Sequence, residues 1–223
     1  MSSIRAACLL LGLLLIGNAA DRTAVAAEPG LTLQRSALLQ LQQHPIVQGN
    51  FTQRRKLSGL PRAIESKGRF VFWRQHGLYW ETLQPFYQAT TFGVDDLIYW
   101  DSIDGPALEA GPKDPVQQYV SQVMLSLFSA DMGELDKLFK SQWHGDRNNW
   151  SLQLLPAQTA VARVIARVQL RGGQYLRSLS VETRSGDRNT MLLDKIKTPA
   201  TLSPTQCLRF SRSAEASCEA GKE

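Results

Sequence analysis

The sequence is poor in the residues that build metal and redox sites. Its 223 residues include three histidines and three cysteines. His44, His76 and His144 lie far apart along the chain, and neither a His-Glu-x-x-His motif nor a closely spaced cysteine pair is present. Such spacings place two ligands beside one metal ion. We therefore expect no metal site.

The short motifs of common enzyme classes are also missing. The chain has no Gly-x-Ser-x-Gly turn, no Ser-x-x-Lys pair and no glycine-rich phosphate loop between a strand and a helix. These motifs activate a nucleophile or hold a nucleotide. Asp95, Asp96 and Asp101 flank an expected strand, where acids of turns and caps are common. We expect a protein that is not an enzyme and needs no cofactor, although an exported lipid-modifying enzyme with an unrecognised site stays open.

Only one long apolar run occurs, and it lies at the start of the chain. Arg5 precedes an apolar stretch from Ala6 to Gly17, and small residues end at Val25-Ala26-Ala27. This is the pattern of a cleaved secretory signal, and the run is too short for a permanent membrane span. We expect a signal peptide over residues 1–27, a single domain over 28–200 and a C-terminal tail over 201–223.

The remaining cysteines and the net charge add two expectations about the exported chain. Cys8 would leave with the signal, so Cys207 and Cys218 form an even pair, which favours a structural disulfide outside the cytoplasm. Without residues 1–27 the chain has 23 Lys and Arg against 19 Asp and Glu, a mildly basic net charge of +4. It fits contact with anionic lipid headgroups, or a solvated basic surface without a partner.

The hydrophobic pattern predicts an α+β fold. We expect helices over 32–43, from Asp114-Pro115 through Phe128, and from Asp131 onward, the last carrying Leu135, Leu138 and Phe139. Alternation and turn signals predict antiparallel strands at 47–57, 63–75, 77–83, 87–93, 97–101, 149–155, 161–171, 175–184 and 189–197. The helices would form a layer on one face of the sheet.

One predicted strand pair combines aromatic residues with a cation. Alternation places Phe70, Phe72 and Arg74 on one face of the first strand, and Leu78 and Trp80 share a face of the next. Such a stripe is most often simple core. Arg74 at its end either reaches water or holds a covering element through backbone carbonyls, for which its five donors are suited.

Several motifs follow one another in the first half of the predicted sheet. They are Phe51-Thr52-Gln53, a Gly-x-Phe strand from Gly68 to Arg74, an aromatic strand with Trp80, Gln84-Pro85, and an Asp-x-Leu-x-Tyr strand from Asp95 to Tyr99. Together they resemble the outer-membrane lipoprotein carrier family, LolA. In that family Pro commonly follows the latch arginine, where this chain has Gln75. The region beyond Thr198 also departs from the family pattern, which suggests a divergent member.

The resemblance implies an unclosed, strongly curved antiparallel β-barrel covered by a helical lid. Arg74 would correspond to the latch, and the lid helices to about 114–141. The implied hydrophobic cavity is lined by Phe70, Phe72, Leu78, Trp80, Met124, Leu127 and Phe128.

The resemblance also implies a function. The chain would be a monomeric carrier in the periplasm of a Gram-negative bacterium, with neither a permanent membrane anchor nor a nucleic-acid partner. It would shield the acyl chains of a lipoprotein or another acylated lipid, between an inner-membrane donor complex and an outer-membrane recipient. The alternative is a periplasmic sensor of lipid or lipoprotein that acts through protein contacts.

Overall fold

A computed structural model describes residues 29–93, 97–103, 105–108 and 115–211. The expected signal peptide and Cys218 therefore lie outside the described residues, as do Asp95 and Asp96. Side chains are described from residue 32 onward, except those of 115–120 in a helix.

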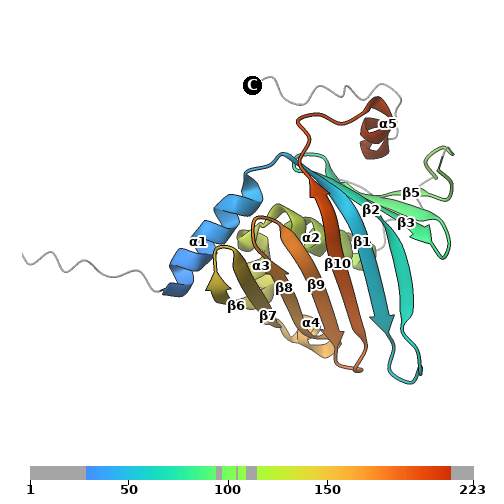
Figure 1. Cartoon of the computed structure of the whole chain (residues 1–223). Coiled ribbons are helices and arrows are strands. Elements are labelled where there is room, and N and C mark those ends of the chain that lie inside the picture. Colours follow the sequence, from blue (N-terminus) through green and yellow to red (C-terminus); the bar gives the residue numbers. More distant parts are fainter. Residues whose placement is uncertain (1–28, 94–96, 104, 109–114, 212–223) are drawn as a thin grey trace, which may run out of the picture.

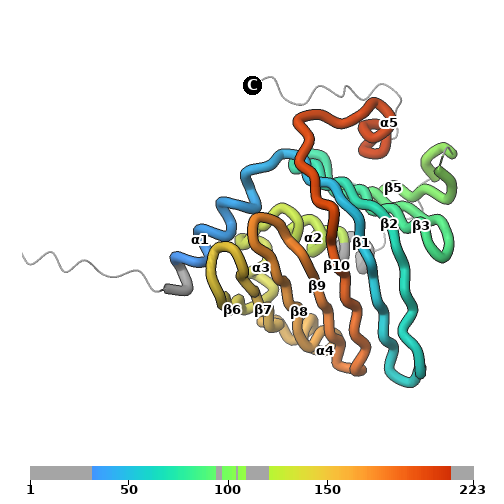
Figure 2. Tube along the Cα trace, in the orientation of Figure 1, coloured from blue at the N-terminus to red at the C-terminus, as the bar shows by residue number. Residues whose placement is uncertain are grey.

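Ten antiparallel strands form one sheet in the order β5-β4-β3-β2-β1-β10-β9-β8-β7-β6. They are β1 (Ile46–Lys56), β2 (Ile64–Trp73), β3 (Gly77–Gln84), β4 (Gln88–Phe92), β5 (Leu97–Trp100), β6 (Phe139–Asp146), β7 (Asn149–Pro156), β8 (Ile165–Gly172), β9 (Leu176–Thr183) and β10 (Arg188–Lys197). Each half of the sheet is a meander of neighbouring strands. The two halves join where β1 pairs with β10, as the adjacent blue and red strands of Figure 2 show. Because β5 and β6 stay at opposite edges, the curved sheet is unclosed.

The helices lie mainly on one face of this sheet (Figure 1). They are α1 (Pro29–Gln42), α2 (Pro115–Ser129), α3 (Met132–Leu138) and α4 (Thr159–Val164), and a short α5 (Pro204–Cys207) follows the last strand. The side chain of Asp131 accepts a hydrogen bond from the backbone N–H of Glu134, so it caps α3 as its sequence spacing predicts. Helices α2 and α3 lie in the connection between the two edge strands. This connection gives the half-barrel its helical lid.

Two hydrophobic clusters lie on opposite faces of the sheet. The larger one packs the inner face against α1, α2 and α3, and includes Phe51, Phe70 and Leu127. The smaller one packs the outer face of β2 to β5 against the C-terminal segment, and includes Trp73 and Cys207. Alternation along β2 explains the division, because Phe70 and Phe72 point inward while Val71 and Trp73 point outward.

Two sequence-based assignments were wrong in part. The predicted strand 161–171 begins with helix α4, and β8 starts at Ile165; the β-branched residues Val161 and Val164 favoured a strand. The second lid helix was expected to carry Phe139 and to reach about 141. It ends at Leu138, because Phe139 adopts extended backbone angles and begins β6.

Candidate functional site

The predicted sheet residues come together on the inner face. Phe70, Phe72 and Leu78 are at most 1% exposed, and the half-buried Trp80 packs against the same cluster. Phe70 lies opposite Trp80, and Phe72 opposite Leu78, in the β2–β3 register. Residues directly opposite one another share a face in an antiparallel pair. The two strands therefore supply a continuous apolar floor.

Helix α2 supplies the cover of this floor. Met124, Leu127 and Phe128 all pack in the inner cluster, with Leu127 5% exposed. The Phe128 ring lies 5.5 Å from the ring centroid of Phe70 and 6.3 Å from that of Trp80, both edge-on. Such edge contacts are favourable geometries for aromatic pairs. The seven residues predicted to line a cavity thus meet at one sheet–helix interface.

A glycine determines how the aromatic floor is arranged. Phe51 on β1 and Trp80 on β3 stack with ring centroids 3.9 Å apart, although β2 runs between their strands. The residue of β2 paired with Phe51 is Gly68. A Cβ on Gly68 would lie 2.7 Å from the Phe51 ring, so a side chain there would displace it. Gly68 therefore leaves room for the Phe51 ring over β2.

A void of about 30 Å³ lies between the sheet and the helices α1 and α2. Its lining residues are Leu41, Val47, Phe70, Phe72, Phe128, Tyr175, Leu176, Leu193 and Ile196. This void holds about one water molecule, so an acyl chain that enters it requires the lining side chains to move.

Sequence reasoning missed part of this lining. Strand alternation puts Val47 on the same face as Phe51, and this signal could have identified Val47. Leu193 could have been identified by the same two-residue period along its own strand. Tyr175 was placed at the start of the strand predicted over 175–184, and in the structure it lies in the turn between β8 and β9.

Arg74 joins the sheet to two helices. It directly follows β2, and its guanidinium donates one hydrogen bond to the Ser129 carbonyl (2.9 Å) and another to the Leu41 carbonyl (3.0 Å). Ser129 is the last residue of α2, and Leu41 is the penultimate residue of α1. The last carbonyls of a helix lack intrahelical partners and carry partial negative charge, so a cation is favourable there. Arg74 therefore links both covering helices to β2.

The surroundings of Arg74 are apolar. Its guanidinium carbon lies 5.6 Å from the centroid of the Phe72 ring, and burial lowers the pKa of the guanidinium. The Nε group has no hydrogen-bond partner within the described part of the chain. A second link nearby runs from the Gln42 side chain to the Ala130 carbonyl at 3.3 Å, which connects α1 to the residue after α2.

The C-terminal segment covers part of the other face. Leu202, Cys207 and Phe210 pack in the outer cluster, and the ring of Phe210 meets that of Trp73 edge-on at 5.5 Å. Cys207 is 1% exposed and is disulfide-bonded. Its predicted partner, Cys218, lies outside the described residues.

Two wider depressions lie on the outer face and are polar. One of about 550 Å³ adjoins α5 and includes Arg69, Glu81 and Arg209. The other, about 320 Å³, lies over β8 to β10 and includes Arg167 and Glu182. Their lining suits polar groups, so the inner cluster is the better candidate for an apolar ligand.

The described ranges contain neither a cluster of metal-ligating residues nor a helix that could span a membrane. No group of three or more His, Cys, Asp and Glu residues there could hold a metal ion. Among the helices described, none combines the length and the apolar character needed to cross a bilayer.

Comparison with known protein families gives a match for this chain. A family model described as "Outer membrane lipoprotein carrier protein LolA" matches residues 43–207, most of the chain. A search of curated proteins gives no match.

Solved structures with a similar arrangement are distant in sequence. LolA superfamily protein NE2245 from Nitrosomonas europaea has 10% identity and a TM-score of 0.43, covering 78% of this chain and 94% of that one. The MucA/MucB complex of Pseudomonas aeruginosa has 13% identity and a TM-score of 0.42, with 78% and 59% covered. LprF from Mycobacterium bovis has 7% identity and a TM-score of 0.35, with 77% and 94% covered.

Proposed function

This chain belongs to the outer membrane lipoprotein carrier LolA family. We propose that it is a carrier of acylated molecules and holds their acyl chains in the space between its sheet and its helical lid. The cargo class is a lipoprotein or another acylated lipid. The carrier acts in the periplasm, after export by the signal at residues 1–27, and passes cargo from an inner-membrane donor to an outer-membrane recipient.

The observation that carries this proposal is the pair of hydrogen bonds made by Arg74. They tie the C-terminal ends of α1 and α2 to β2 beside the aromatic cluster. Apart from these bonds, α1 and α2 meet the sheet mainly through apolar side chains. An acyl chain can replace such apolar contacts when the lid opens, because the hydrophobic effect is not directional.

The energetics of the cargo explain why a lid is needed. Burial of one CH₂ group contributes about 0.8 kcal/mol, so a chain of about fourteen carbons contributes on the order of 10 kcal/mol. A cavity able to offer that much apolar surface would promote aggregation if it stayed exposed to water. The packed inner cluster keeps this surface covered until cargo enters.

Binding can be driven without nucleotide hydrolysis. A ligand shifts a closed–open equilibrium by the difference between its affinities for the two forms. A recipient that binds the acyl chains more tightly then suffices for directional transfer.

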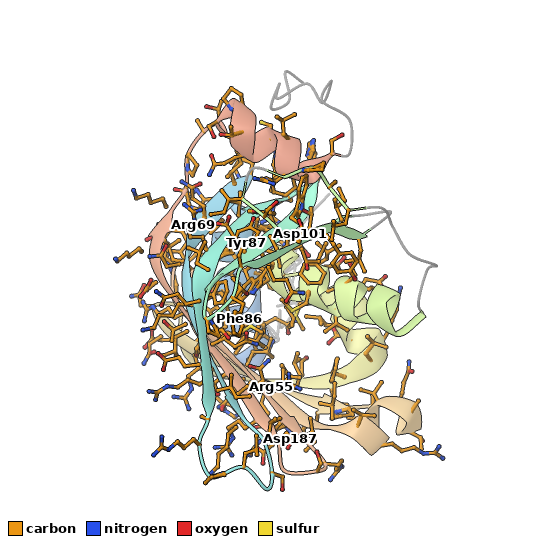
Figure 3. The ribbon with its side chains drawn as sticks, turned by 90° about the vertical axis from the view of Figure 1, so that its right-hand side faces the viewer. Arg55, Arg69, Phe86, Tyr87, Asp101 and Asp187 are labelled. Atoms are coloured by element: carbon orange, nitrogen blue, oxygen red, sulfur yellow. The ribbon has the colours of Figure 1, made fainter. Side chains whose placement is uncertain are left out.

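Two variants test the site with a matched control. In Trp80→Glu, a carboxylate enters the aromatic floor, where an unpaired charge is costly to bury. In Phe86→Glu, the same change is made at an 82% exposed ring between β3 and β4, labelled in Figure 3. We expect Trp80→Glu to reduce binding of a fluorescent palmitoyl probe at least tenfold while circular dichroism still shows a folded sheet. Phe86→Glu should bind the probe like the wild type.

The outcomes separate the carrier from its alternatives. Native mass spectrometry of protein isolated from a periplasm, with lipid extraction, should find an acylated molecule bound to the wild type. A stable complex with the ectodomain of a membrane protein, together with no acyl-probe binding, would instead indicate a sensor. Unfolding of Trp80→Glu alone would assign Trp80 a core role, and the palmitoyl titration of the wild type would then decide the carrier proposal.

A further inference from the structure

Positive charge is concentrated at one end of the molecule. Three segments meet there, residues 54–67, 159–167 and 182–188, which we call the basic end. They contain nine Lys and Arg and three Asp and Glu, a net charge of +6. The whole chain has 25 Lys and Arg against 20 Asp and Glu. The remaining residues therefore have a net charge of −1, so the excess charge of the protein is located in these three segments.

The three segments are connected by hydrogen bonds. The backbone N–H of Ser58, in the β1–β2 turn, donates to the Asp187 side chain in the β9–β10 turn at 2.6 Å. Arg184 donates from its side chain to the Ala162 carbonyl of α4 at 3.0 Å. Its backbone N–H donates to the Val164 carbonyl at 2.9 Å. Figure 1 shows these turns at the end of the sheet opposite α5, and Figure 3 labels Arg55 and Asp187 at that end.

The acids of the basic end already have partners. Glu65 pairs with Arg54 and Lys67, and Glu182 pairs with Arg167 and Arg188.

Five cations of the basic end make no ion pair within the described residues: Arg184, whose side chain donates to the Ala162 carbonyl, and four others without a side-chain hydrogen bond there. These four side chains are exposed, and they come from β1, the β1–β2 turn and α4: Arg55, Lys56, Arg62 and Arg163. Their positive charge is therefore available to a partner.

Aliphatic side chains are exposed among these cations. Leu60 and Ile64 in the β1–β2 hairpin are each 47% exposed, and Val164 at the end of α4 is 63% exposed. Cations mixed with aliphatic side chains suit the interface of a bilayer, where headgroups meet acyl chains. A soluble polyanion would use the cations alone.

We propose that the basic end docks on the surface of a bilayer containing anionic phospholipid. Clustered Lys and Arg are attracted to such a surface, and the attraction falls off within a Debye length. Leu60, Ile64 and Val164 then enter the headgroup region. Docking orients the sheet with its basic end toward the membrane. This inference is independent of the cargo, because it uses neither Arg74 nor the inner cluster.

Vesicle flotation with the purified chain lacking the expected signal, residues 28–223, tests the proposal. Vesicles of phosphatidylglycerol and phosphatidylethanolamine should carry the protein upward at 50 mM NaCl, and vesicles of phosphatidylcholine should not. The triple variant Arg55→Gln, Lys56→Gln, Arg62→Gln should lower the partition coefficient at least tenfold. These three side chains make no hydrogen bond among the described residues, so folding should persist.

A matched control removes three exposed cations elsewhere: Arg35→Gln, Lys140→Gln and Lys197→Gln. It should retain most of the binding. Equal loss in the two triple variants would overturn the proposal, because net charge rather than the basic end would then govern binding. Absence of flotation with anionic vesicles would also overturn it.

A double variant without the exposed aliphatic side chains distinguishes binding to a bilayer from binding to a soluble polyanion. Leu60→Ser with Ile64→Ser should weaken vesicle binding at least threefold and leave retention on a heparin column unchanged. Retention on heparin with no effect of these changes on vesicle binding would contradict the bilayer assignment.

Discussion

Phe51 and Trp80 stack at a centroid separation of 3.9 Å across the strand that lies between them. The Phe51 ring could not take this position beside a β2 side chain at position 68. The Gly68 backbone makes the contact possible, and Phe51 is 2% exposed as a result. Two residues of the motifs that resemble the family, Phe51 and Gly68, are therefore explained by one packing arrangement.

Gly68→Ala should destabilise the protein. The added Cβ would lie 1.9 Å from the Glu81 carbonyl oxygen and 2.7 Å from the Phe51 ring. Overpacking of this kind costs about 1–3 kcal/mol, and backbone displacement raises the cost. Chemical denaturation should show the loss. Gly59→Ala, in the exposed β1–β2 turn where no atom lies within 4 Å, tests backbone strain alone because its φ is 91°. An unchanged midpoint for Gly68→Ala would contradict the packing explanation.

Arg74→Leu should loosen the lid while the sheet stays folded. The variant removes both hydrogen bonds and leaves the carbonyls of Leu41 and Ser129 without the guanidinium. Hydrogen bonds to charged groups contribute about 1.5–3 kcal/mol each, and partial exposure reduces this value. Amide exchange in residues 121–129 should accelerate at least tenfold, and exchange in β1 should change little. Arg171→Leu, an exposed outer-face change, serves as the control and should leave both rates unaltered.

His76 should make stability depend on pH. Its ring stacks on Trp73 at 3.5 Å, and burial lowers the pKa of the imidazole below its ordinary value of about 6.5. The unfolded chain then binds a proton more readily than the folded one. The free energy of unfolding should therefore fall as pH drops through about 6.5, and level off below the folded pKa. Urea denaturation between pH 7.5 and 5 should show a smaller fall for His76→Phe, whereas Gln75→Ala should behave as the wild type.

The disulfide of Cys207 should connect it to Cys218. Cys207 is buried beneath the C-terminal segment, so the bond would hold this segment against the outer face. The ring is short, and its contribution should be roughly 3 kcal/mol at most. Peptide mapping without reductant should recover the Cys207–Cys218 pair, and reduction should lower the Tm. A free thiol at position 207 in protein kept oxidised would contradict the assignment.

Much of the fold follows from periodicity. Strands with β-branched and aromatic residues, such as β2 and β3, were predicted within two residues of their bounds, and Asp131 correctly marked the start of α3. Strand β6 was missed because Phe139 continues the helical spacing of Leu135 and Leu138, and the following residues are largely polar. There, pairing with β7 outweighs local propensity.

In the candidate site, the aromatic floor was predictable from the sequence, whereas the hydrogen-bond partners of Arg74 were not. Alternation identifies which side chains share a face, so the aromatic floor could be read from β2 and β3. The partners of Arg74 could not, because the Leu41 and Ser129 carbonyls lie 33 and 55 residues away along the chain. Only the packing of α1 and α2 brings both helix ends to one guanidinium.

The pairing of β1 with β10 also determines when this sheet can be completed. Gln48 lies opposite Lys197, so the middle of the sheet joins residues from the two ends of the domain. Loop closure over such a separation is slow, and it cannot occur before residue 197 has been synthesised. The half-barrel therefore forms only after its last strand, β10, is available. Until then, the edge of β1 that β10 covers has no strand partner, and the first five strands make up at most one half of the sheet.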